Sequence, residues 1–319
     1  MSLAQALATA VSGLRTTQSG MALVASNVAN AQTPGYVRKT LDQTASGGAD
    51  VGISVRTEGI NRVLDQYLQT QLRTESAGGA YADLKSQFYQ RLQTVYGDPG
   101  AAGGIESVYN NFTNAVQALS TSPEDYSART AVLSSAQTLT QQLNSLTGGI
   151  QGLRSDAESA LSSAVGSANE AMQQIAALNR ELATASSSDA AAATLLDRRD
   201  QYIDQLAQLM DIRVTTGDFN QVSVFTSSGV QLVGTRAAQL AFSPQGAITP
   251  TAQWSADPQK RGVGTITLTS PTGASIDLIA NQSIRSGQIA AKASSYDKLS
   301  SVQASASLSD IASISFSTR

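Results

Sequence analysis

The sequence predicts a mainly α protein with a β-rich domain: an N-terminal heptad helix, then an elongated helical bundle, then a small antiparallel β domain. Three observations predict this class. Apolar residues recur at spacings of three and four near the N-terminus and again through the middle of the chain. After about residue 211 they alternate with polar residues instead. The 319 residues amount to roughly two domains' worth of chain.

The first predicted element is a helix of roughly 28 residues, because its apolar side chains follow a heptad seam. The six main seam residues are Leu3, Leu7, Leu14, Met21, Val24 and Val28. Arg15 is the only charged residue among the first 37, and the other flanking residues are mostly Ser, Thr, Gln, Gly and Ala. Small neutral flanks let other helices approach closely. The seam therefore packs either on the core of its own chain or on neighbouring chains, and the pattern alone allows both.

A turn is predicted directly after this helix. Pro34 lacks an amide hydrogen and favours an extended residue before it, so it ends the helix. Pro34 and Gly35 fit the two central positions of a type II turn. With residues 1–36 assigned to the terminal helix and turn, we expect residues 37–60 to form a connecting loop that contains a short strand.

Residues 61–211 are predicted to form the elongated helical bundle. Helical spacing runs through residues 61–96, with a candidate break at Gly78–Gly79, and continues over residues 105–119. Ser122 can cap the next helix, since Pro123 suits a first helical position. That helix is either a single one of roughly 60 residues or two shorter ones, a length that favours an elongated coiled-coil bundle.

A last helix of the bundle begins at Asp189 or Thr194, after a serine-rich loop. Residues 212–281 then alternate apolar and polar side chains between Gly, Pro and Asn, which predicts a small antiparallel β domain standing outward from the helices. Residues 282–319 are assigned to a return segment and an atypical C-terminal tail.

Composition excludes several classes of function. Only 14% of residues are charged and the net charge is −3, so we expect no binding to nucleic acid or to an anionic membrane surface. No run of ~18 apolar residues is present, so no membrane span is expected. The chain has no Cys and no His, which removes thiol nucleophiles, the commonest catalytic base and the commonest transition-metal ligands. We expect no cofactor and no metal.

The densest group of charges is Asp197, Arg198, Arg199 and Asp200. The two aspartates are three residues apart on one helix face, a spacing compatible with a catalytic carboxylate pair. The structural interpretation is that they pair with the adjacent arginines and with neighbouring helices. We adopt it and expect no enzyme; the alternative is an exported hydrolase that uses Asp and Glu pairs.

The segment Ser26–Tyr36, which follows the heptad helix, resembles the N-terminal signature of the axial proteins of the bacterial flagellum. Three further groups of segments narrow the resemblance to the hook-associated protein 1 (FlgK) family. They are residues 52–55 with 64–73, residues 104–107 with 118–123 and 128–129, and residues 195–200 with 222–225. The resemblance covers roughly residues 1–291 in the right order, and residues 292–319 do not match the C-terminal helix of that family.

The resemblance implies a structural subunit that forms the hook–filament junction by helix-mediated self-assembly. It implies secretion by type III export without a cleaved signal peptide and an extracellular place on the flagellum. The implied partners are a ring of identical subunits, neighbouring hook and hook-associated proteins, an export chaperone and the export apparatus.

The implied assembly residues are the six of the seam, and the implied signature turn comprises Asn27, Asn30, Thr33, Pro34, Gly35 and Tyr36. A rod or hook subunit is the nearer alternative, because those proteins share the same N-terminal signature.

Overall fold

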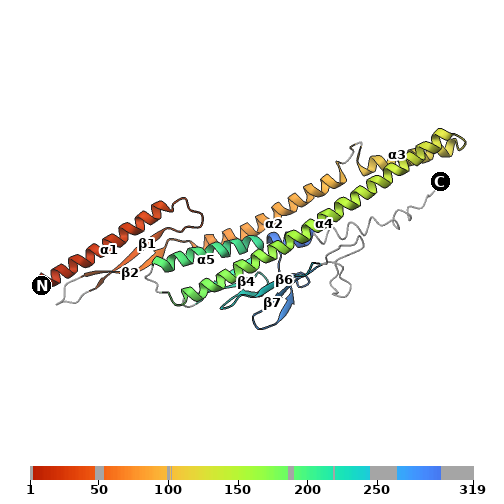
Figure 1. Cartoon of the computed structure of the whole chain (residues 1–319). Coiled ribbons are helices and arrows are strands. Elements are labelled where there is room, and N and C mark those ends of the chain that lie inside the picture. Colours follow the sequence, from red (N-terminus) through yellow and green to blue (C-terminus); the bar gives the residue numbers. More distant parts are fainter. Residues whose placement is uncertain are drawn as a thin grey trace.

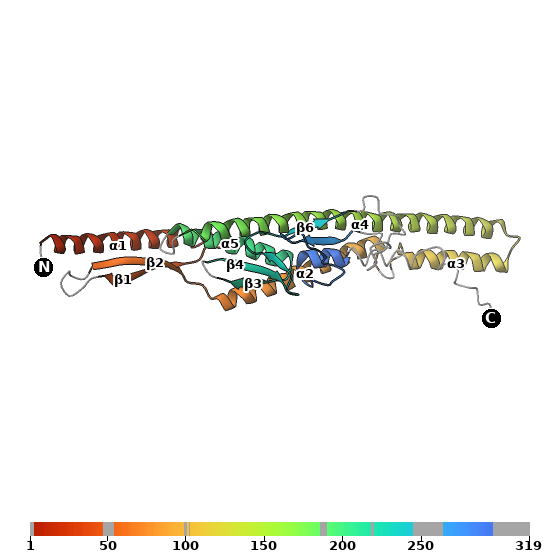
Figure 2. The ribbon, with the colours of Figure 1, turned by 90° about the horizontal axis from the view of Figure 1, so that it is seen from below.

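The computed structural model describes residues 3–46, 54–98, 101, 103–185, 190–217, 220–244 and 264–295. The molecule is long and thin, with helix α1 at one end and α3 with the start of α4 at the other (Figures 1 and 2). The described helices and strands follow the predicted order, helices first and most of the strands after them. The mainly helical class with a β-containing region is therefore confirmed.

Helix α1 spans Leu3–Ala29, which confirms the heptad helix. Residues 37–60 were predicted as a loop with one short strand, but the described ones among them form most of an antiparallel hairpin of β1 (Lys39–Ser46) and β2 (Ser54–Arg62). The prediction missed β1 because Leu41 and Ala45 are its only apolar residues, so it carries no alternating pattern. The hairpin lies alongside α1 rather than over a core (Figure 1).

Helix α2 spans Gln66–Tyr96 and passes through Gly78–Gly79 without the predicted break. It begins later than predicted because residues up to Arg62 belong to β2. Asp65 caps it, accepting hydrogen bonds from the backbone N–H of Tyr67 and Leu68. Helix α3 follows over Ile105–Thr121, close to the predicted range.

Helix α4 is a single helix over Tyr126–Leu182, about 85 Å long. The predicted start at Ser122–Pro123 is wrong, because Asp125 is the N-cap and accepts a hydrogen bond from Ser127 N at 2.8 Å. The short side chain of Asp125 reaches that amide, while Ser122 and Pro123 lie in the preceding turn. Helix α5 spans Ala190–Leu209, and the predicted serine loop at residues 186–188 lies outside the described residues.

Within the described residues, six strands follow α5 and form two three-stranded antiparallel sheets. The first sheet consists of β3 (Ile212–Thr216), β4 (Val222–Thr226) and β5 (Gln231–Val233). The second consists of β6 (Gln239–Phe242), β7 (Ile266–Thr269) and β8 (Ser275–Asp277).

The two sheets do not stand outward from the helices. One hydrophobic cluster joins the C-terminal half of α4 with α5, both sheets and the helical residues 287–295. Its fully buried members include Ile175 of α4, Ile203 of α5, Val224 of β4 and Ile289. The strands bury one face against the helices because two small sheets cannot bury enough apolar surface alone. Of the predicted return segment, residues 296–319 lie outside the described residues.

Candidate assembly interface

The seam of α1 faces away from the rest of the described chain. Its six predicted residues are all exposed: Leu3 90%, Leu7 65%, Leu14 59%, Met21 61%, Val24 62% and Val28 71%. Val11 adds a seventh exposed apolar side chain on the same helix. The described residues do not bury the seam, so packing on the core of its own chain does not account for the heptad pattern there.

The opposite face of α1, which contacts the hairpin, is mostly polar or small. Thr16 is buried and its hydroxyl lies 3.4 Å from the carbonyl oxygen of Val55 in β2. A side chain at Gly20 would meet Leu41 of β1, and only Leu23 places a large apolar side chain on this face with less than a tenth of it exposed. The helix thus presents its apolar stripe outward and its polar stripe inward.

The outward-facing apolar stripe of α1 strongly favours association with another apolar surface. Full burial of a Leu, Val or Met side chain contributes roughly 1.5–3 kcal/mol. Contiguous exposed apolar surface of this kind marks an interaction site more often than isolated exposed residues do. The seam therefore has the properties of an interface that a neighbouring helix would cover.

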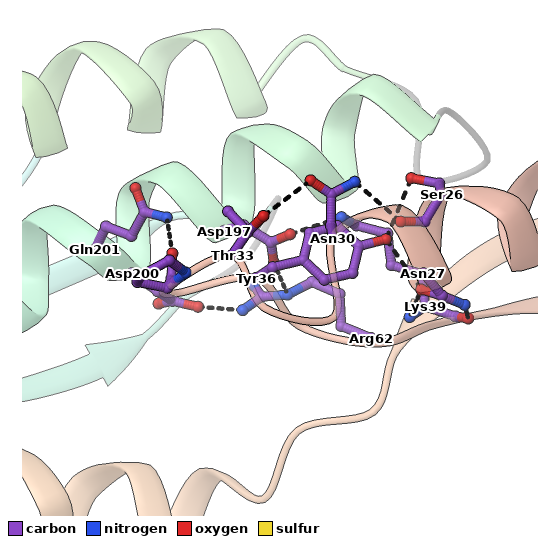
Figure 3. Close-up of polar contacts among 11 residues, drawn as sticks. Ser26, Asn27, Asn30, Thr33, Tyr36, Lys39, Arg62, Asp197, Asp200 and Gln201 are labelled. Atoms are coloured by element: carbon purple, nitrogen blue, oxygen red, sulfur yellow. Dashed lines mark hydrogen bonds and ion pairs between the residues drawn. The ribbon is translucent and has the colours of Figure 1, made fainter.

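Asn27, the first residue of the signature turn, connects α1 to the hairpin through its side-chain amide. Its Nδ2 donates to the carbonyl oxygen of Lys39 at 2.8 Å, and its Oδ1 accepts from the backbone N–H of Lys39 at 3.0 Å. The hydroxyl of Tyr36 also donates to Asn27 Oδ1, at 2.9 Å (Figure 3). The side-chain amide of Asn27 thus hydrogen-bonds both backbone groups of Lys39, as the backbone of an adjacent strand would.

Asn30 and Thr33 close the end of the helix. Asn30 Nδ2 donates to the carbonyl oxygen of Ser26 at 2.9 Å, and the Thr33 hydroxyl donates to Asn30 Oδ1 at 3.3 Å. The carbonyl oxygen of Ser26 also accepts from the backbone N–H of Asn30 at 3.0 Å, so the Asn30 amide adds a second bond to the last turn of the helix. A carboxylate at Asn27 or Asn30 would lack the N–H that each amide donates here.

Pro34 and Gly35 form the predicted type II turn. Tyr36 N donates to Thr33 O at 3.2 Å, and Gly35 has a φ of +77°. A β-carbon at Gly35 would lie 2.6 Å from the Cγ of Gln201 in α5, so the turn packs closely on that helix. Gln201 Nε2 donates to Pro34 O at 3.2 Å. The turn is thereby attached to α5, a contact that the sequence pattern did not indicate.

Asp197 and Asp200 are the candidate carboxylate pair, and both are occupied by cations from other elements. Lys39 Nζ of β1 lies 2.6 Å from Asp197 Oδ2, and Arg62 Nε of β2 lies 3.0 Å from Asp197 Oδ1. Arg62 also pairs with Asp200, and Arg73 of α2 lies 3.3 Å from Asp200 Oδ1. The pairing role is thus confirmed, but the partners lie on the hairpin and α2.

The prediction that Asp197 and Asp200 pair with the adjacent arginines is wrong for Arg199. Its Nη1 donates to Asn179 Oδ1 of α4 at 3.3 Å and to the carbonyl oxygen of Asn220. Burial lowers the pKa of Arg199 to about 10, with Asp200 opposing that shift. On a helix, adjacent residues point in different directions, which separates the roles of Arg199 and Asp200.

Asp204 extends the acidic row by one more turn, and sequence reasoning missed it together with Lys39, Arg62 and Arg73. Arg73 Nε donates to Asp204 Oδ1 at 2.6 Å. The spacing of Asp197, Asp200 and Asp204 places all three on one face of α5. That signal was readable, whereas the cations lie 127 to 158 residues away in sequence and only the fold brings them close.

Membrane-spanning helices and clusters of metal ligands are both absent from the described residues. No described helix is long and apolar enough to cross a membrane. Within the same residues, no group of three or more Asp or Glu side chains is arranged to hold a metal ion.

Comparison with known protein families gives two matches. Residues 89–318 match the model of the flagellar hook-associated protein FlgK helical domain. This chain belongs to the FlgK family. The match runs beyond residue 291, so it includes most of the segment in which the sequence motifs gave no resemblance. Residues 7–36, which hold most of α1 and the turn, match the flagella basal body rod protein family.

Individual relatives agree with this family. The chain is 27% identical over 221 residues to flagellar hook-associated protein 1 of Bacillus subtilis (strain 168), covering 66% of this chain and 43% of that protein. It is 26% identical over 246 residues to the protein of the same name from Salmonella typhimurium, covering 75% and 44%.

A solved structure is also similar, that of the flagellar hook junction protein FlgK from Burkholderia pseudomallei. The TM-score is 0.59 at 28% sequence identity, and the match covers 71% of this chain and 38% of that one. The chain therefore spans less than half of the length of the relatives that it matches.

Proposed function

We propose that this chain is a structural subunit of the bacterial flagellum that forms the junction between hook and filament by helix-mediated self-assembly. The observation that carries the proposal is the exposed seam of α1. An apolar stripe that the described residues leave uncovered favours association as soon as a matching helix is present. Membership of the FlgK family and the names of the relatives support this function.

The partners proposed are a ring of identical subunits, neighbouring hook and hook-associated proteins, an export chaperone and the export apparatus. The place proposed is extracellular, after type III export without a cleaved signal peptide. The helix α1 makes few apolar contacts within the described part of its own chain, so little free energy favours its order in isolation. Burial of its seam by neighbouring subunits offsets the cost of ordering the helix, which supports export before assembly.

We also propose that the chain is not an enzyme. Asp197 and Asp200, the carboxylate pair of the alternative hydrolase, are each in ion pairs with two cations and are mostly buried. Side chains of the same chain therefore occupy the carboxylate oxygens that a substrate would have to reach. The rod or hook alternative is less well supported, since the rod-protein match covers residues 7–36 alone.

Immunogold labelling of intact flagella, with antibody against the β-strand region, tests this function. Label confined to a collar between hook and filament is the expected result. Label along the whole hook would assign the chain to the hook class, and absence of label would contradict the proposal.

A pair of matched variants tests the seam itself. We expect Leu7→Gln, Leu14→Gln and Met21→Gln together to abolish the collar label, because each removes apolar surface from the interface. The control carries Leu7→Met, Leu14→Met and Met21→Leu, which keep apolar character and approximate volume, and it should assemble. The amount of each variant in the medium is measured, so that a loss of assembly is separated from a loss of export.

A further inference from the structure

The part of the molecule that carries the seam is attached to the rest through charged side chains rather than through the hydrophobic core. We call residues 3–62, which hold α1, the turn and the hairpin, the arm, and the described part of residues 66–295 the body. In Figure 1 the arm projects from one end of the body, where α5 begins. Among the described residues, neither hydrophobic cluster contains a residue of the arm. Burial of apolar side chains in the body's core therefore does not hold the arm in place.

Charged side chains meet at the point of attachment instead. Lys39 and Arg62 of the hairpin contact Asp197 and Asp200 of α5 (Figure 3). Arg73 of α2 completes the group from the body side. Arg73 also pairs with Asp204, so three cations meet three carboxylates.

The pairs that Asp197 and Asp200 make differ from ordinary surface ion pairs in their burial, whereas the side chain of Asp204 is 42% exposed. The side chains of Lys39 and Asp197 are 5% and 6% exposed, and those of Arg62 and Arg73 are only slightly more exposed. Exposed pairs contribute little, but removing one partner of a buried pair leaves an uncompensated charge and is strongly unfavourable. Each buried cation thus requires its carboxylate at one place on α5.

We propose that Asp197, Asp200 and Asp204 form a docking strip on α5 that fixes the angle at which the arm leaves the body. Apolar contact is non-directional, whereas charge-assisted hydrogen bonds require a defined geometry. The strip thereby orients the seam before any neighbour is present. Asp197 and Asp200 are positioning residues for the arm, and Asp204 holds Arg73 in register with them. This inference concerns the single chain and does not depend on the proposed assembly.

The absence of Cys makes the angle measurable. Introducing Gln18→Cys on the exposed side of α1 and Ser163→Cys on the exposed side of α4 provides two sites for spin labels without background. Double electron–electron resonance on the full chain, at a concentration where light scattering shows a monomer, gives the distribution of distances between arm and body. We expect one narrow distribution.

Asp197→Asn and Arg62→Gln are each expected to broaden or shift that distribution, because they leave buried charges unpaired. The matched control is Asp156→Asn, which removes the same charge from an exposed pair with Arg91 elsewhere on the body and should change nothing. Combining Lys39→Gln with Asp197→Asn removes both members of one pair and should narrow the distribution relative to Asp197→Asn alone. Such partial rescue distinguishes charge pairing from simple loss of packing.

Two results would overturn the proposal. One is a distribution in Asp197→Asn and Arg62→Gln that is indistinguishable from that of the parent. The other is loss of cooperative unfolding of the body in Asp197→Asn, measured by circular dichroism, because it would make Asp197 part of the body's own fold and not of the attachment.

Discussion

At the arm–body junction, individual side chains perform two separate tasks. Asn27 pairs with the backbone of Lys39, and the side chain of Lys39 then pairs with Asp197. Lys39 Nζ also lies 4.0 Å from the centre of the Tyr36 ring, which adds a cation–π contact. One short stretch of chain therefore joins helix, hairpin and body.

Asp204 gives the junction a defined pH dependence. Burial raises its pKa above the ordinary 3.8, and the hydrogen bond from Arg73 opposes that shift without cancelling it; Asp200 also raises the pKa and Arg62 lowers it. The folded state consequently binds the proton more tightly than the unfolded state. The contribution of Asp204 to the free energy of unfolding is then largest below pH 3.8 and falls as the pH rises through the folded-state pKa.

Asp204→Asn should therefore gain in the free energy of unfolding relative to the parent as the pH rises from 3.8 towards neutral. Urea unfolding of both proteins across this range measures the difference. If the free energy of unfolding of Asp204→Asn instead falls relative to that of the parent as the pH rises, the hydrogen bond from Arg73 outweighs burial in setting the pKa of Asp204.

Gly35→Ala should loosen the turn. The left-handed backbone and the close approach of Gln201 together oppose a β-carbon there, and we expect a cost of about 1–2 kcal/mol. Amide hydrogen exchange in β1 should then become roughly 5–30-fold faster. Gly13→Ala is the control, because a β-carbon at Gly13 meets nothing within 4 Å and Ala favours a helix. Equal exchange in Gly35→Ala and the parent would refute this account of the turn.

At the scale of elements, α4 has two unlike halves. Its C-terminal half supplies Leu161, Met172 and Ile175 to the main hydrophobic cluster, whereas Leu133 near its N-terminus is 61% exposed. One continuous helix thus supports a packed core at one end and lies along α3 at the other (Figure 2). Between them, Ile150 and Leu153 pack on the C-terminal part of α2.

Substitutions in the two halves should differ accordingly. We expect Ile175→Ala to lower the free energy of unfolding by about 2–5 kcal/mol, because the residue is fully buried. Leu133→Ala should change it by less than about 0.5 kcal/mol. Urea unfolding followed by far-ultraviolet circular dichroism measures both, and similar losses at the two sites would contradict the assignment of the core.

How far the sequence alone predicted these elements depended on the range of the interactions. The 3-4 spacing of α1 and the Pro34–Gly35 turn are local signals, and both were predicted correctly. Strand β1 was missed because its polar residues carry no alternating pattern. The partners of Asp197 and Asp200 were missed because Lys39 lies 158 residues away from Asp197. Local pattern carries no information on which distant cation folds against a helix.

At the scale of the whole molecule, two different kinds of contact hold the two parts. The body is held by apolar packing, and the arm is held on α5 by hydrogen bonds and buried ion pairs, so that the described part of the chain leaves the apolar seam of α1 exposed. This division explains how one chain can be a folded monomer and still retain a surface for association. It also places the seam at the far end of a long molecule (Figure 1).

Thiol reactivity at one seam position tests the central claim most directly. The chain lacks Cys, so a single introduced thiol can be followed. The test variant is Leu14→Cys, because Leu14 is 59% exposed. The control variant is Thr272→Cys, in the exposed turn after β7. Both thiols should react quickly with maleimide in the monomer. In isolated flagella Leu14→Cys should be protected while Thr272→Cys still reacts. Protection of Leu14→Cys in the monomer, or its equal reactivity in both states, would contradict the account of the seam as an assembly interface.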